Sequence, residues 1–142
     1  MSLSFPWWGY ALLSAFFAAL TTIFAKIGVD QISSNLATAI RTAVVLVMVW
    51  GIVIATGEIG GLGSVPRNVW VFLVLSALAT GLSWLFYFKG LQVGRASYVA
   101  PIDKTSVAMV LVLAVLFLHE PLTWQGALGT LLILAGTLVF IL

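Results

Sequence analysis

Five long apolar runs, separated by short polar segments, account for almost the whole chain. Each run holds about 20 residues, which is the length that an α-helix needs to cross the hydrocarbon core of a bilayer. The pattern therefore predicts an all-α integral membrane protein, a bundle of five transmembrane helices forming a single domain over residues 1–142. The expected spans are residues 7–27, 36–56, 69–88, 96–118 and 122–142.

Composition supports the membrane assignment and excludes several classes of function. Of the 142 residues, 63% are hydrophobic and 7% are charged, whereas soluble domains carry about 25% charged residues. A net charge of +2 does not suggest a nucleic-acid surface. With no cysteine, one histidine and no paired carboxylates at a shared depth, we expect no enzyme, no metal site and no cofactor. The N-terminus, MSLSFPWWGY, lacks the basic region of a signal peptide, so we expect the first run to be retained.

Two of the runs carry features that favour helix contacts or a cavity. Small residues follow one face of the first run, which allows another helix to approach closely or lines a cavity: Ala11, Ser14, Ala15, Ala18, Thr22 and Ala25. The third run ends in an aromatic cluster, which is typical of a membrane interface but also suits a ligand: Trp84, Phe86, Tyr87 and Phe88.

The fourth run is the least typical, because it carries Pro101, Asp103 and Lys104 within its first third. Pro101 has no backbone N–H and frees the carbonyl of Ser97, which predicts a helix break. Asp103 lies about 10 Å below the start of this span. A carboxylate at that depth needs a protein partner or a water-filled cavity.

The partner of Asp103 is expected to come from another span. Neighbouring residues on a helix point about 100° apart, so Lys104 is not expected to neutralise Asp103. Arg41, inside the second span, and Lys89, at the end of the third, are the available cations. Alternatively, long stems such as those of Lys26 and Lys89 only reach up to the headgroups. The candidate substrate or coupling residues are Asp103, Lys104, Arg41, Lys89, Trp84 and Tyr98. In the last run, Gly129 and Gly136 share a face and predict a packing surface.

The distribution of Lys and Arg predicts the orientation. Five spans place the termini on opposite sides, with Arg67 alone on the N-terminal side. The other side carries five cations: Lys26, Arg41, Lys89, Arg95 and Lys104. The positive-inside rule then places the N-terminus outside and the C-terminus in the cytoplasm of a cell membrane.

Taken together, these features resemble the EamA domain of the drug/metabolite transporter superfamily. The similar elements are Tyr-x-Lys-Gly-Leu at Tyr87–Leu91, Gly94–Arg95–Ala96 before a span with an early proline, and the turn from Leu118 to Thr123. A closing helix with Gly129 and Gly136 completes the pattern, and Lys26 and Arg41 fit it upstream. In the turn, His119 stands where the family usually has glycine before the glutamate.

The resemblance implies one repeat of a ten-helix transporter, in which two inverted repeats surround a cavity lined by the first, third and fourth spans. A single repeat then implies a dimer with itself or with a paralogous half-transporter. The leading hypothesis is a transporter that exports or exchanges a small metabolite or drug-like solute by alternating access. The alternatives are a non-transporting membrane subunit packed against a larger partner, and a component of a lipid-carrier flippase. The expected partners are therefore the lipid bilayer, the small-molecule solute and this second chain, and no nucleic acid is expected among them.

Overall fold

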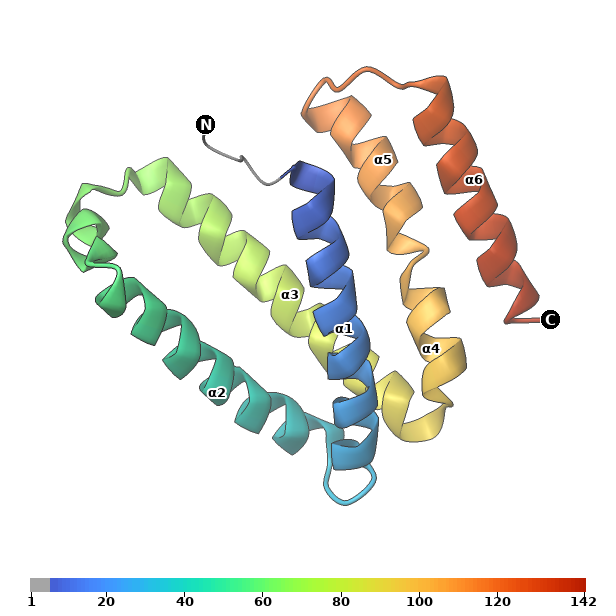
Figure 1. Ribbon diagram of the computed structural model, residues 1–142, viewed down its shortest axis with the longest axis horizontal. Helices are drawn as coiled ribbons and strands as arrows, with labels where there is room; N and C mark the ends of the chain where they lie inside the picture. Colours follow the sequence, from blue (N-terminus) through green and yellow to red (C-terminus); the bar gives the residue numbers. More distant parts are fainter. Residues whose placement is uncertain (1–5) are drawn as a thin grey trace. The chain divides into compact units, whose positions relative to one another are not determined.

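The computed structural model describes residues 6–142, and helices are the only regular secondary structure in that range. The predicted all-α membrane fold is thereby confirmed. The elements in chain order are α1 (Trp7–Val29), α2 (Ser34–Ala55), the 3₁₀ helix η1 (Glu58–Ser64), α3 (Arg67–Val93), α4 (Ala96–Asp103), α5 (Ser106–Phe117) and α6 (Trp124–Val139) (Figure 1). The expectation about a signal peptide falls partly on residues 1–5, which lie outside the described residues.

Four helical stretches are long and apolar enough to cross a membrane: α1, α2, α3 and the stretch Ala96–Phe117, which comprises α4 and α5. The helix in the fifth predicted span, α6, has 16 residues. Its length is therefore about 24 Å, against about 30 Å of hydrocarbon. The helices group into two compact units, divided between Val93 and Gly94.

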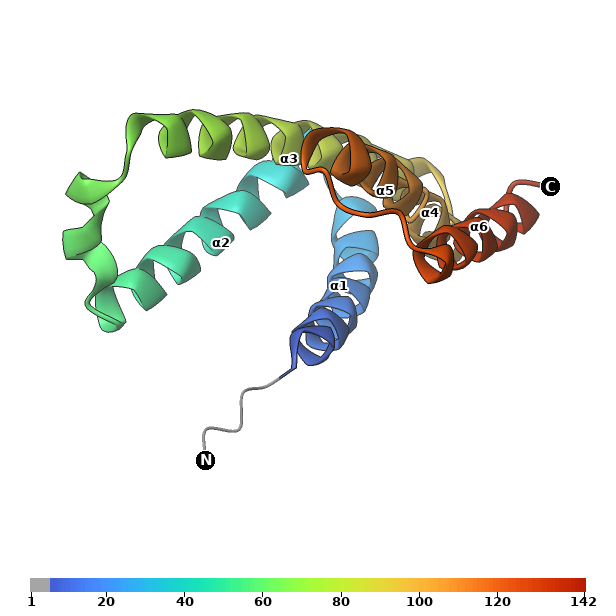
Figure 2. The same cartoon turned by 90° about the horizontal axis from the view of Figure 1, so that it is seen from above.

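In unit 1, α1, α2 and α3 meet at one end. Its buried residues all belong to the end of α1, the start of α2 or the end of α3, apart from Gly9: Val29, Ser34, Thr38, Phe88 and Leu91. From the loop that joins them, α1 and α2 diverge, as Figure 2 shows. Most of the large apolar side chains of these helices are exposed, as expected for helices that lipid or another protein surrounds.

Hydrogen bonds join the C-terminal ends of α1 and α3. The Lys26 Nζ atom donates to the Leu91 carbonyl at 2.7 Å and pairs with Asp30 Oδ1 at 3.2 Å. In return, Gln92 Nε2 donates to the carbonyls of Val29 at 3.4 Å and Ile32 at 3.1 Å. The last carbonyls of a helix lack partners within the helix and carry partial negative charge, so a cation and an amide donor satisfy both ends. Lys26 is therefore a structural residue rather than a side chain that only reaches for the headgroups.

We expect Lys26→Met to lower the free energy of unfolding by about 1.5 kcal/mol, because it removes a charged donor from a helix end. Lys89→Met is the matched control. It removes the same charge near the end of α3, but its Nζ only contacts the exposed Gln92 Oε1 at 3.3 Å. The control should change the free energy by less than about 0.5 kcal/mol. Titration with sodium dodecyl sulfate in mixed micelles measures both values. Equal losses in the two variants would contradict the structural role of Lys26.

In unit 2, the stretch predicted as one span is interrupted. Pro101 lies inside α4, and the interruption falls one turn later, at Lys104 and Thr105. The position of the predicted break therefore needs correction. The amides of Lys104 and Thr105 bond three residues back, to Pro101 and Ile102, both at 3.0 Å. The Thr105 hydroxyl also donates to the Ile102 carbonyl at 2.8 Å. Threonine hydroxyls that bond back to the previous turn bend helices, which accounts for the shift.

Around the interruption, α4 packs on α6, and further along α5 packs on α6. The buried hydroxyl of Thr137 on α6 lies 2.8 Å from the Ile133 carbonyl and 3.3 Å from the Pro101 carbonyl. Thr123 begins α6, and its side chain accepts the amide of Gly126 at 3.1 Å. In the preceding turn, His119 has φ 55°. Because glycine adopts this backbone region without strain, the conformation explains why glycine suits this position.

Candidate functional site

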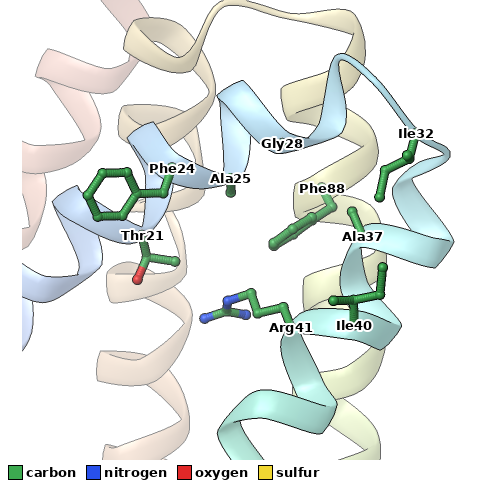
Figure 3. A pocket seen from close by; sticks show the side chains of 9 residues that line it. All are labelled: Thr21, Phe24, Ala25, Gly28, Ile32, Ala37, Ile40, Arg41 and Phe88. Atoms are coloured by element: carbon green, nitrogen blue, oxygen red, sulfur yellow. The ribbon is translucent and has the colours of Figure 1, made fainter.

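A hollow of about 370 Å³ lies in unit 1 and takes its lining from all three helices (Figure 3). Thr21, Phe24, Ala25 and Gly28 come from α1, Ile32 from the following loop, Ala37, Ile40 and Arg41 from α2, and Phe88 from α3. A volume of this size is typical of sites for small molecules. Its lining is apolar except for the Thr21 hydroxyl and the Arg41 guanidinium.

Arg41 contributes the charged side chain to the lining of this hollow. Its guanidinium carbon lies 4.2 Å from the centre of the Trp84 ring and 5.5 Å from that of Phe88. Figure 3 shows the side chain extending from α2 towards Thr21 on α1. Within the described residues of unit 1, no carboxylate lies within 4.0 Å of the guanidinium, and its N–H groups have no hydrogen-bond acceptor.

An unpaired cation inside a spanning helix is costly. The insertion of an arginine at the centre of such a helix costs about 2.5–3.5 kcal/mol on insertion scales. Stacking on the Trp84 face offsets part of this cost, by about 0.5–2 kcal/mol for a cation over an aromatic ring. Arg41 is the eighth residue of α2 and lies nearer the start of that helix than its centre, so its insertion cost is at most this large. Its role as a substrate or coupling residue stays a prediction.

The sequence shapes the wall of the hollow through small residues on α1. Thr21, Ala25 and Gly28 follow each other at spacings of four and three, so they share one helix face. A Cβ atom added to Gly28 would meet no atom within 4 Å. The backbone of α1 therefore borders open space here, and a larger side chain would enter the hollow. The small-residue stripe was predicted either to line a cavity or to contact another helix, and the structure shows both. Ala25 lines the hollow, whereas Thr22 contacts Tyr87 of α3 through a 2.7 Å hydrogen bond between the two hydroxyls.

Two of the predicted site residues, Arg41 and Trp84, lie together in unit 1. Lys89 does not line this hollow, since its Nζ atom contacts Gln92 Oε1 on the exposed surface of α3. The aromatic cluster is divided in the same way. Trp84 and Phe88 face Arg41, whereas Phe86 is 75% exposed. An interfacial girdle alone does not explain this arrangement.

The other three predicted residues belong to unit 2. Lys104 Nζ lies 3.5 Å from Asp103 Oδ2, so the expectation that these neighbours do not pair is wrong. The flexible four-carbon stem of Lys104 lets its ammonium group reach the neighbouring carboxylate. The contact is long, and both side chains are partly exposed. Pairing of Asp103 with Arg41 or Lys89 stays a prediction. The Tyr98 ring lies edge-on to Phe140, with 5.8 Å between ring centres.

The predicted packing glycines have open surroundings. A Cβ atom added to Gly129 or Gly136 would meet nothing within 4 Å among the described residues, so packing at this face stays a prediction. Gly126 is the tight position, where an added Cβ would lie 3.0 Å from Thr123 Oγ1. A second hollow, of about 440 Å³ between α5 and α6, is lined by apolar side chains and Thr130. It offers no charge for recognition.

Sequence reasoning did not identify Thr21, Phe24 and Gly28 as residues of the site. The sequence feature that could have identified them is their position near the end of the first apolar run, next to the small residues Thr22 and Ala25. Arg41 lies near the start of the following run and therefore at a similar depth in the membrane. No group of three His, Asp or Glu side chains in the described range could hold a metal ion.

Comparison with known proteins completes the description of the chain. Residues 6–142 match the EamA-like transporter family. An "uncharacterized transporter in cobO 3'region" from Sinorhizobium is 52% identical over 139 residues, which cover 98% of this chain and 97% of that protein. The "uncharacterized protein MJ1333.1" of Methanocaldococcus jannaschii is 27% identical over 134 residues, 90% of each chain. No solved structure matches significantly. With its apolar helices and a family match over nearly its whole length, the chain belongs to the EamA-like transporter family of membrane proteins.

Proposed function

We propose that the protein is a half-sized transporter that moves a small solute across the cell membrane by alternating access, as a unit of two chains. One observation carries the proposal: three apolar helices of unit 1 line an open hollow of molecular size beside a cation that has no carboxylate partner in that unit. A subunit that only packs against a partner has no need for such a hollow, because close packing excludes open space between helices. The family membership supports transport in general, and the hollow supplies a place for the solute.

The requirement for two chains follows from the exposure of the helices. Only four apolar residues are buried among the described ones: Val29, Phe88, Leu91 and Ala114. Lipid covers part of the remaining apolar surface, but a solute pathway needs protein on all sides, because lipid cannot satisfy polar groups. The partner is a second copy or a paralogous half-transporter. It completes the pathway in the manner of repeat-built transporters, whose sites lie between repeats.

The test is uptake into proteoliposomes, measured across a panel of small metabolites with wild-type protein, Gly28→Leu and Gly51→Leu. Leucine at position 28 should occupy part of the hollow beside Arg41 and reduce flux by at least about tenfold, because the side chain takes space that the solute needs. Gly51→Leu is the matched control. Gly51 also lies within a helix with nothing within 4 Å of an added Cβ, but it does not line the hollow. Both changes raise helix propensity equally, by about 1 kcal/mol.

We expect Gly51→Leu to transport at the wild-type rate. Wild-type protein that moves no solute of the panel would count against the transport function. Transport that survives Gly28→Leu would show instead that the solute does not pass through this hollow.

A further inference from the structure

We propose that the hollow of unit 1 binds an anion, held by the edge of the Arg41 guanidinium, so that the solute carries a carboxylate or phosphate group. The inference deepens the proposed transport function, on which it rests for the identity of the solute. Both a free solute and a lipid headgroup can carry such an anionic group, and the experiment below distinguishes these two sources of the anion.

The geometry of Arg41 leaves its hydrogen-bonding edge available. A guanidinium stacked on an aromatic ring uses its flat face, and its five N–H donors point outward in the plane. Here the Trp84 ring occupies the face at 4.2 Å, and no described residue of unit 1 accepts from the N–H groups. Planar donor pairs of this kind match carboxylate and phosphate oxygens in bidentate fashion. The guanidinium is therefore held in place while its donors remain free.

The surroundings of Arg41 favour an anion over other ligands. Thr21 supplies the other polar group of the lining, and its hydroxyl can donate a second hydrogen bond to the same ligand. The hollow contains no carboxylate, so nothing in it would attract a cation, whereas Arg41 repels one. Phe24, Ile40 and Phe88 provide apolar walls for the body of the solute. The site thus suits a small molecule with one anionic end and an apolar part.

The competing explanation is that a carboxylate elsewhere in the assembly neutralises Arg41. Asp103 is the candidate that the sequence suggests, and its only ion-pair contact among the described residues is Lys104 Nζ at 3.5 Å. If Asp103 occupied the guanidinium edge permanently, an added anion would have to displace it. Asp103→Asn would then strengthen anion binding, and this variant is therefore part of the test.

The experiment measures binding of phenyl phosphate to the full chain in dodecyl maltoside, a detergent without phosphate, by isothermal titration calorimetry. Phenyltrimethylammonium is the matched probe, with the same ring and the opposite charge. We expect phenyl phosphate to bind wild type and Gly51→Leu, and phenyltrimethylammonium to bind neither. Arg41→Gln should weaken phenyl phosphate binding by at least about tenfold, as expected for loss of a charged hydrogen bond. Arg41→Lys should fall between, because a lysine lacks the planar fork.

Gly28→Leu keeps Arg41 and fills the space beside it, so it should abolish binding even if Arg41→Gln does not fold. Circular dichroism and size-exclusion chromatography establish which variants are folded. Equal binding of the two probes to wild type would overturn the anion site. Phenyl phosphate binding that persists in both Gly28→Leu and a folded Arg41→Gln would do the same. Tighter binding in Asp103→Asn would show that Asp103 holds the guanidinium in the wild-type protein, and would overturn the proposal of a free donor edge.

Native mass spectrometry with added dioleoylphosphatidylglycerol or dioleoylglycerol identifies the source of the anion. If the phospholipid is retained through Arg41 and displaces phenyl phosphate, the anion site stands and its natural ligand is a lipid headgroup. If neither lipid competes, the site serves a free solute. Binding needs no flux, so an Arg41-dependent anion site in a protein that transports nothing would refute only the transport function. Transport of a cation that Arg41→Gln leaves unchanged would refute only the anion site.

Discussion

Replacement of Asp103 by asparagine is expected to reduce solute flux by at least about tenfold while the protein remains folded. Asparagine keeps the size and the hydrogen-bond acceptor of the side chain and removes its charge. Asp103 ends α4 inside a stretch that is long and apolar enough to span the membrane. Lys104 Nζ is its nearest cation in the described structure, at 3.5 Å. A carboxylate retained at this depth, with a single long ion-pair contact, has a desolvation cost that a purely structural residue would avoid.

Asp30→Asn is the matched control for this experiment. It makes the same chemical change on a carboxylate that lies in a loop, 51% exposed, and pairs with Lys26 at 3.2 Å. We expect flux in Asp30→Asn to remain within about twofold of wild type, as for most changes to exposed ion pairs. Both variants should be reconstituted at equal density and their initial uptake rates compared. Equal rates for Asp103→Asn and wild type would remove Asp103 from the transport mechanism.

A tag at the C-terminus is expected to be found only in the cytoplasm of intact cells. In unit 1, Lys26, Arg41 and Lys89 lie towards the end where α1 and α3 finish and α2 begins. Arg67 lies at the opposite end, at the start of α3. Cations near the ends of spans favour the cytoplasmic side, which places the shared end of unit 1 inside and the N-terminus outside.

The measurement is labelling of a single cysteine introduced after Leu142, in a chain that otherwise has none. A membrane-impermeant maleimide should label it after lysis and not before. As a control, a cysteine in place of Ser64, in the segment between α2 and α3, should be labelled in intact cells. Similar labelling of the terminal cysteine before and after lysis would indicate insertion in both orientations, and would favour an antiparallel homodimer over the fixed orientation.

The helices themselves were predictable because burial in lipid leaves a strong signal in a single sequence. Twenty consecutive apolar residues favour a spanning helix whatever its neighbours are, and α1, α2 and α3 fall on the expected runs. The interruption in the fourth run was predictable in kind but not in place. Pro101 indicates a disturbed helix, whereas the actual position depends on the competition of the Thr105 hydroxyl for the Ile102 carbonyl. A propensity argument does not include that bond.

The candidate site was predictable only in part, because its contacts join distant segments. A lone arginine within an apolar run identifies Arg41 as unusual, but no periodicity states that Trp84, which is 43 residues away, will lie under its guanidinium. The open space beside Gly28 is likewise a property of three helices and not of one. A sequence pattern shows which residues share a face of one helix. It does not show how the faces of different helices are arranged around a hollow.

The hydrogen bonds between the ends of α1 and α3 also restrict how unit 1 can move. Lys26 and Gln92 join the two helices within the last turns of each, and the Thr22–Tyr87 bond lies little more than one turn away. A rotation of α1 about this joined end would change these distances little, while the far end of a helix more than 30 Å long would sweep through several ångströms. With these bonds intact, the end of α1 at Trp7 is therefore freer to move relative to α3 than the end at Lys26.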